Sequence, residues 1–130
     1  MSTIFSKIVN GEIPCYKVHE NDEFLAFLDV FPVSRGHVLV IPKKETDYIF
    51  DIEDQSYSRM WQYAKKIAKA LKLSFNCQRV GVSVIGLEVA HAHIHLLPIN
   101  SLEDMNFSKQ KMKLSKQEFE EIAKVISSNI

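Results

Sequence analysis

Residues 91–98 place three histidines at alternate positions, with alanine, isoleucine and leucine between and after them. This alternation is typical of a β-strand with two unlike faces, on which successive imidazoles lie about 6.6 Å apart. A strand that buried all three rings as core filler would leave several ring nitrogens without hydrogen-bond partners. Because imidazole titrates near neutral pH, three of them in register indicate either nucleophilic and proton-transfer chemistry or a metal site.

The apolar pattern elsewhere predicts the order helix, strands, helix, strands, helix. Ser2 or Thr3 caps a short N-terminal helix, and acidic residues at 51 and 54 mark the start of the longest one. A capping box beginning at Ser115 opens a C-terminal helix. Strands are expected over residues 16–20, 24–29, 37–41, 79–85 and 88–97, with a tight turn at Gly86 before the last of them. Short connections between strands favour an α+β fold with an antiparallel sheet.

Size and charge narrow the possible functions. A chain of 130 residues is expected to form one domain over residues 1–130. Its 16 acidic and 16 basic side chains balance, so no overall field attracts nucleic acid or an anionic membrane. Cys15 and Cys77 lie far apart in no metal-type spacing and are expected to be reduced thiols. The first residues show no export signal, so we expect a cytoplasmic protein.

Four motifs together resemble one family. The histidine alternation is preceded by IFSKIVNGEIP at residues 4–14, FLDV at 27–30 and GHVLVIPKK at 36–44. In this order they resemble the histidine-triad (HIT) family of nucleotide-binding proteins, in the nucleoside phosphoramidase branch and a bacterial-type form. The resemblance covers nearly the whole chain and implies one HIT domain with an antiparallel sheet, one long helix and short terminal helices.

The resemblance also implies an activity. The implied protein is a hydrolase or transferase that cleaves a purine nucleoside phosphoramidate, or a related nucleotide, at the α-phosphate. His93 resembles the nucleophile that forms a covalent nucleotidyl intermediate, between the flanking histidines His91 and His95 and near a fourth, His37. A ring nitrogen can attack phosphorus only when it is unprotonated, which agrees with this assignment. No cofactor is implied, and such subunits usually form homodimers.

Nucleotide-binding residues follow from the same correspondence. Asp29 resembles the carboxylate that accepts hydrogen bonds from the ribose hydroxyls, although a turn cap before Pro32 is an alternative role for it. Ser83 is the nearby polar candidate for contacting the phosphate. The positions that wall the base are Ile4, Phe5, Ile8, Phe27, Leu28, Val30 and Leu39.

The sequence departs from the family pattern before the triad. Many relatives have Gly-Gln-Ser or Gly-Gln-Thr there, with polar side chains that reach the phosphates, whereas this chain has Gly86, Leu87 and Glu88. Leu87 cannot hydrogen-bond, and an inward-pointing Glu88 would repel phosphate. Residues 100–114 show little periodicity and are expected to form a loop with solvated lysines at 109, 111 and 113.

Metal binding is the competing interpretation of the histidines. Some bacterial relatives hold zinc with two cysteines, a histidine after Pro-Lys-Lys and the first triad histidine. Here the matching residues are Thr3, Ser6, Glu45 and His91, and a lone histidine makes a weak site, so no metal is expected. A dinucleoside polyphosphate hydrolase and a non-enzymatic nucleotide sensor or interaction module remain open as alternative functions.

Overall fold

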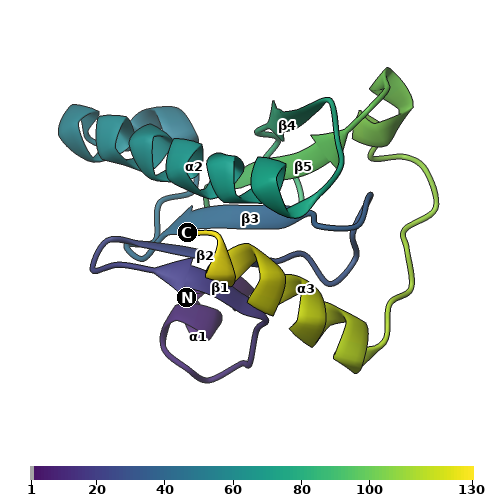
Figure 1. The fold of residues 1–130 in the computed structure, drawn as a ribbon. Coiled ribbons are helices and arrows are strands. Elements are labelled where there is room, and N and C mark those ends of the chain that lie inside the picture. The colour runs from purple at the N-terminus through teal and green to yellow at the C-terminus, as the bar shows by residue number, and fades with distance from the viewer. Residues whose placement is uncertain (1) are drawn as a thin grey trace.

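A five-stranded antiparallel sheet forms the centre of the computed structural model, which describes residues 2–130 (Figure 1). The strands lie in the order β1-β2-β3-β5-β4, so β1 and β4 are the edges. The strands are β1 Lys17–Glu20, β2 Phe24–Leu28, β3 Val38–Pro42, β4 Arg79–Ser83 and β5 Ile94–Ile99. The helices are α1 Ile4–Val9, α2 Asp54–Ser74 and α3 Lys116–Ser128, with short 3-10 turns at Ile49–Asp51 and Leu102–Met105. The predicted α+β class is confirmed.

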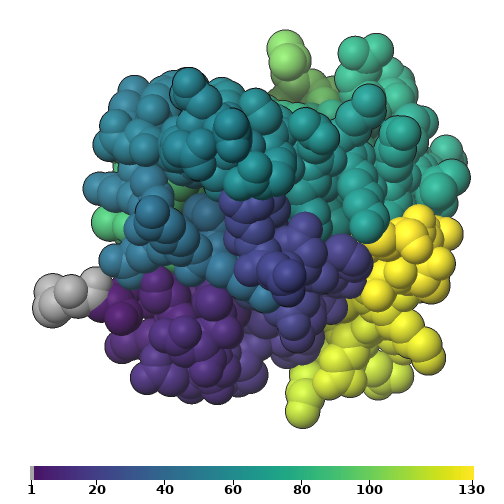
Figure 2. All heavy atoms as spheres, turned by 90° about the vertical axis from the view of Figure 1, so that its left-hand side faces the viewer, coloured from purple at the N-terminus to yellow at the C-terminus, as the bar shows by residue number. Residues whose placement is uncertain are grey.

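Helices cover the sheet unequally. The long helix α2 and the C-terminal α3 lie on one face, and α1 lies on the other (Figure 1). Figure 2 shows the same separation, with the purple atoms of the N-terminal segment below the teal atoms of α2. Alternation along β2 divides its side chains between the two faces: Phe24 and Leu28 join the core under α2 and α3, whereas Leu25 and Phe27 join a smaller cluster with Phe5 of α1.

Local sequence signals set the helix ends. Thr3 caps α1, since its side-chain oxygen accepts a hydrogen bond from the backbone N–H of Ser6. Ser115 and Glu118 form the predicted capping box at the start of α3, and Phe119 is buried on its inner face. None of the helices in residues 2–130 combines the length and the apolar character that crossing a membrane requires.

The histidine segment differs from its prediction. β5 begins at Ile94, so His95 lies in the strand, whereas His91 and His93 belong to an irregular connection over residues 84–93. The predicted tight turn at Gly86 is therefore wrong, and of the predicted 88–97 strand only residues 94–97 are confirmed. The cause is a long-range hydrogen bond. The backbone N–H of Ala92 donates to the carbonyl of Thr46, 2.7 Å away, and Thr46 lies in a loop, so this bond belongs to no strand pairing. Smaller shifts occur elsewhere: β4 ends at Ser83 and Pro42 closes β3.

Candidate active site

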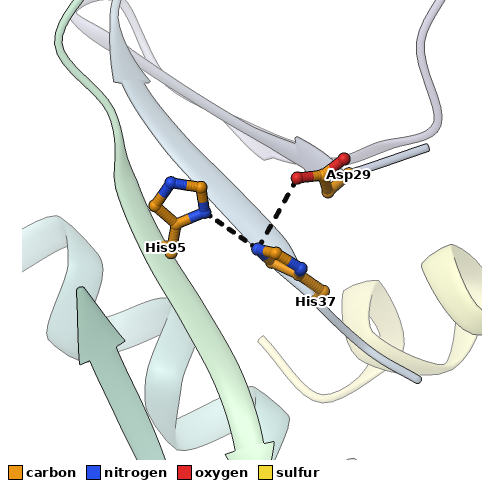
Figure 3. Close-up of side chains that lie close together, drawn as sticks. All are labelled: Asp29, His37 and His95. Atoms are coloured by element: carbon orange, nitrogen blue, oxygen red, sulfur yellow. Dashed lines mark hydrogen bonds and ion pairs between the residues drawn. The ribbon is translucent and has the colours of Figure 1, made fainter. Parts of the chain in front are cut away.

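Three neighbouring strands bring an acid and two histidines together (Figure 3), on the face where Leu39 packs with Phe5 of α1. His37 lies directly before β3, and His95 stands opposite Leu39 in the register of β3 and β5. Asp29 directly follows β2, and its carboxylate reaches the same place from the neighbouring strand. The order β2-β3-β5 thus gathers residues that lie far apart in the sequence.

His37 is the centre of this cluster and is only 1% exposed. Its Nε2 lies 2.9 Å from Nδ1 of His95 and 3.6 Å from Oδ2 of Asp29. The backbone N–H of Val33 points at its other nitrogen, Nδ1, from 3.1 Å. Because a backbone N–H can only donate, Nδ1 of His37 is the acceptor, and neutral His37 carries its proton on Nε2.

That proton determines the tautomer of His95. The Nε2–H of His37 donates to Nδ1 of His95, so neutral His95 carries its own proton on Nε2. This nitrogen lies on the side of the ring away from His37 (Figure 3). Burial, the main cause in both rings, lowers the pKa of His37 to about 3 and that of His95 to about 4, so both are neutral near pH 7. His95 therefore presents an N–H donor.

Neutral His93 has the other tautomer. Its Nδ1 lies 2.7 Å from the carbonyl oxygen of His91, which can only accept, so the proton of the neutral ring lies on Nδ1 and the lone pair on Nε2. The ring packs edge-on against Phe5 and His95, with centroids 5.1 and 4.9 Å away. An imidazole with fixed orientation and a free lone pair is suited to nucleophilic attack.

Asp29 has two contacts, one for each carboxylate oxygen. Oδ1 accepts the backbone N–H of Phe31 at 2.8 Å, which is the turn-capping role considered above. Oδ2 faces His37, and burial of the carboxyl raises its pKa. The turn contact leaves Oδ2 free to accept further hydrogen bonds, so ribose binding stays a prediction.

His91 supports the site from behind and does not line it. The side chain is fully buried; its Nε2 donates to the carbonyl of Pro42 at 2.8 Å, and its Nδ1 lies 2.9 Å from the hydroxyl of Thr3. Both ring nitrogens are thus occupied. His91 has no exposed surface, so in this conformation it orients its neighbours and offers no ring nitrogen to a ligand.

A cavity of about 340 Å³ opens beside His93, His95 and Asp29. The 84–93 connection contributes Leu87 and Glu88 to its wall. A segment that sequence reasoning missed supplies the opposite wall, namely the loop over residues 106–114 with Phe107, Ser108 and Lys111. This loop has no apolar periodicity, so no sequence signal pointed to it. A larger cavity of about 910 Å³ lies between α3 and residues 14–17, and none of the four site histidines lines it.

The predicted base-walling residues divide into three groups. Phe5, Phe27 and Leu39 lie in one buried cluster on the α1 side, with Ile8 packed against it. Ile4 and Val30 are about half exposed, at 51% and 48%. Leu28 packs in the core on the opposite face of the sheet. Ser83 stands opposite His95 in the register of β4 and β5, so the two side chains share a face.

Comparison with known proteins decides the family. The sequence pattern of the HIT domain matches residues 10–102. The chain belongs to the HIT family. It is 37% identical to an uncharacterised HIT-like protein of Borreliella burgdorferi, over 98% of this chain and 97% of that one. It is 35% identical to adenosine 5'-monophosphoramidase of Schizosaccharomyces pombe, over 100% and 99% of the two chains.

Structural comparison agrees with the sequence match. A crystal structure of a HIT-like protein of Bartonella henselae, described as involved in cell-cycle regulation, superposes with a TM-score of 0.87 at 30% identity. The match covers 99% of this chain and 96% of that one. This chain is accordingly a member of a family of nucleotide hydrolases and transferases.

The residues at the zinc positions of some HIT relatives form a hydrogen-bonded group in this chain. The hydroxyl of Ser6 donates to Oε1 of Glu45 at 2.6 Å, and the backbone N–H of Thr3 donates to the same oxygen at 2.9 Å. Thr3 also contacts His91, whose other ring nitrogen is bonded to Pro42. The hydroxyls of Thr3 and Ser6 replace the thiolates that give such a site its affinity, and they are engaged with His91 and Glu45, so this group does not fit zinc.

A second possible ligand set consists of Asp29, His37 and His95, whose candidate ligand atoms all lie within 4.8 Å of one another. Coordination through Nε2 of His37 would require its Nδ1 to be protonated, as metal-bound histidines normally are. The N–H of Val33 already donates to that Nδ1. The N–H of Val33 and a protonated Nδ1 of His37 would then be two donors facing each other, so this set disfavours a metal ion.

We expect activity to be independent of bound metal. Turnover should be unchanged after dialysis against a chelator, because the tautomers that the site needs are set by hydrogen bonds between protein groups. Elemental analysis of untagged protein should find well under one zinc per chain. Stoichiometric zinc, together with activity lost on chelation and regained with zinc, would instead make the histidines ligands.

Proposed function

We propose that this chain cleaves a purine nucleoside phosphoramidate, or a related nucleotide, at the α-phosphate through a covalent nucleotidyl-His93 intermediate. One observation carries the proposal: Nε2 of His93 has a free lone pair beside the N–H donor of His95, in a cavity that Asp29 also lines. The relative in Schizosaccharomyces pombe named adenosine 5'-monophosphoramidase supports the phosphoramidate class.

The proposed chemistry has two displacements at phosphorus. In the first, the lone pair of His93 Nε2 bonds to phosphorus as the phosphorus–nitrogen bond breaks, and the amine leaves with that electron pair and takes a proton from water. In the second, water attacks phosphorus as the bond to His93 Nε2 breaks, and a proton of that water neutralises the hydroxide left by the first step. The nucleoside monophosphate departs and His93 regains its lone pair. One water molecule is consumed overall. Neutral His95 does not surrender its N–H proton, so its role is to stabilise charge on the phosphoryl oxygens.

Trapping the intermediate tests the proposal. Protein mixed with an adenosine phosphoramidate and quenched in acid-free denaturant should gain the mass of one nucleoside monophosphate, and peptide mapping should place it on His93. A dinucleoside polyphosphate hydrolase would form the same adduct but show the higher kcat/KM on dinucleotides. Nucleotide binding without any adduct would favour the sensor function, which Leu87 and Glu88 in the cavity wall support.

Asp29→Asn is expected to discriminate between ribose and deoxyribose ligands. Asparagine keeps an oxygen for the N–H of Phe31 but removes the charge that would accept both ribose hydroxyls. Ribonucleotide binding should weaken by about 1.5–3 kcal/mol, the usual worth of hydrogen bonds to a charged group, and 2′-deoxyribonucleotide binding much less. Titration calorimetry with both ligands measures this. Equal losses would leave Asp29 with its turn-capping role alone.

We infer a homodimer from the free sheet edge together with the family resemblance. β4 is an edge strand, and Val82 within it and Ile85 after it are 48% and 44% exposed. Exposed apolar edges are normally covered by another chain. Sedimentation equilibrium should show two chains per particle, and Val82→Lys should shift the equilibrium towards monomer. Val125→Lys, on the equally exposed surface of α3, serves as the control and should leave the particle unchanged.

A further inference from the structure

Lys111 is the one lysine or arginine among the described residues that line the histidine cavity. The other charged side chains in that wall are the carboxylates of Asp29 and Glu88. Since burial keeps His37 and His95 neutral near pH 7, these two rings supply no compensating charge. An anionic phosphate that entered this cavity would therefore meet two carboxylates and one ammonium group.

The loop that carries Lys111 is fixed against the site. The backbone N–H of Met112 donates to the carbonyl of Pro32 at 2.9 Å, which ties the loop to the segment between β2 and β3. The ring of Phe107 packs edge-on against His95 and His37, with centroids 4.9 and 5.8 Å away. Lys111 is partly buried, so the expectation that it is simply solvated is wrong, whereas Lys113 is exposed as expected.

The ammonium group of Lys111 is positioned but not fully occupied. It donates to the carbonyl oxygens of Phe107 and, at 3.3 Å, of Lys109, both in its own loop. An ammonium group has three donors, so one remains for a ligand. The positive charge of Lys111 acts on the cluster, because it is one of the causes that lower the pKa of His37 and that partly offset the raised pKa of Asp29.

We propose that Lys111 is the phosphate-binding cation of this site and donates to an oxygen of the α-phosphate of a bound nucleotide. The proposal rests on the function proposed above and adds a specificity-determining residue to it. Lys111 would offset the charge of Glu88 and take over the phosphate contacts for which Leu87 has no polar group. It lies outside residues 10–102, so the HIT-domain match assigns it no role.

The test compares a nucleotide with its nucleoside. By titration calorimetry, Lys111→Met should weaken binding of adenosine monophosphate about 10-fold or more, the usual effect of losing a charge-assisted hydrogen bond, and leave adenosine binding within two-fold of wild type. Lys111→Arg should retain most of the affinity. Glu88→Gln should tighten binding of the monophosphate. Lys113→Met, an exposed lysine on the same loop, should change neither ligand.

Three outcomes would overturn the proposal. Unchanged binding of the monophosphate to Lys111→Met would show that Lys111 does not contact phosphate. Equal weakening of adenosine and its monophosphate, in both Lys111→Met and Lys111→Gln, would show that Lys111 only holds its loop. An equal effect of Lys113→Met would show a diffuse charge effect. Because these measurements need no turnover, an enzyme without a covalent intermediate could still bind phosphate through Lys111, and the two proposals can fail separately.

Discussion

Replacing His93 by alanine is expected to abolish both the covalent adduct and turnover, with a loss in kcat on the order of 10⁴-fold or more. The variant lacks the only ring whose free Nε2 faces the cavity, and the neighbouring His95 presents a proton instead of a lone pair. Nucleotide binding should survive, because Asp29 and Lys111 remain. Single-turnover kinetics and mass spectrometry measure the loss, and calorimetry measures the binding.

Two further variants make this prediction specific. His93→Gly leaves a space that free imidazole can enter, so added imidazole should restore part of the turnover without forming an enzyme adduct. His19→Ala removes a histidine that neither lines the cavity nor contacts the other histidines; it lies on β1, bonds to Tyr63 and should leave kcat near the wild-type value. Turnover of pure His93→Ala at the wild-type rate would eliminate covalent catalysis by this residue.

Acid is expected to destabilise the fold in a pH range where most carboxylates are still ionised. The folded-state pKa values of His37 and His95, about 3 and about 4, lie below the unfolded-state value of about 6.5. Between these values the unfolded chain binds more protons than the folded one, so the free energy of unfolding rises with pH. The stability is complete above pH 6.5 and falls as the pH decreases, by about 1.4 kcal/mol per pH unit for each histidine that stays neutral.

Urea unfolding at several pH values between 7.5 and 4.5 measures this loss. His19 and His91, whose pKa values burial also lowers, add to it, and Asp29, whose pKa burial raises, opposes it at the acid end. His37→Asn should flatten the dependence by the share of one histidine, since its amide oxygen still accepts the N–H of Val33 and does not titrate. A free energy of unfolding that stays constant from pH 7 to 5 would contradict the neutral His37–His95 pair.

Local rules were sufficient for much of the fold. The capping residues Thr3 and Ser115 and the alternating faces of β2 follow from side chains only a few positions apart, so the sequence predicts them directly. His93 and His95 line the same cavity, as their alternation in the sequence indicates. They do so although His93 lies in the loop before β5 and His95 lies within β5.

Long-range contacts explain what the sequence did not reveal. The histidine alternation resembles one strand, but His91 lies outside β5. Its side chain is instead hydrogen-bonded to the carbonyl of Pro42, a residue 49 positions away. Phe107 and Lys111 reach the cavity because their loop is tied to Pro32, and nothing in residues 100–114 signals that contact. Periodicity reports only which face a residue occupies and not which distant segment lies opposite it.

The anchoring of His91 has a practical consequence for handling this protein. The carbonyl that orients the ring of His93 belongs to His91, whose side chain contacts the hydroxyl of Thr3, the N-cap residue of α1. A fusion partner or purification tag joined close to Thr3 would thus act on the orientation of the His93 ring through two hydrogen bonds in series, so additions intended for kinetic work are better placed away from α1.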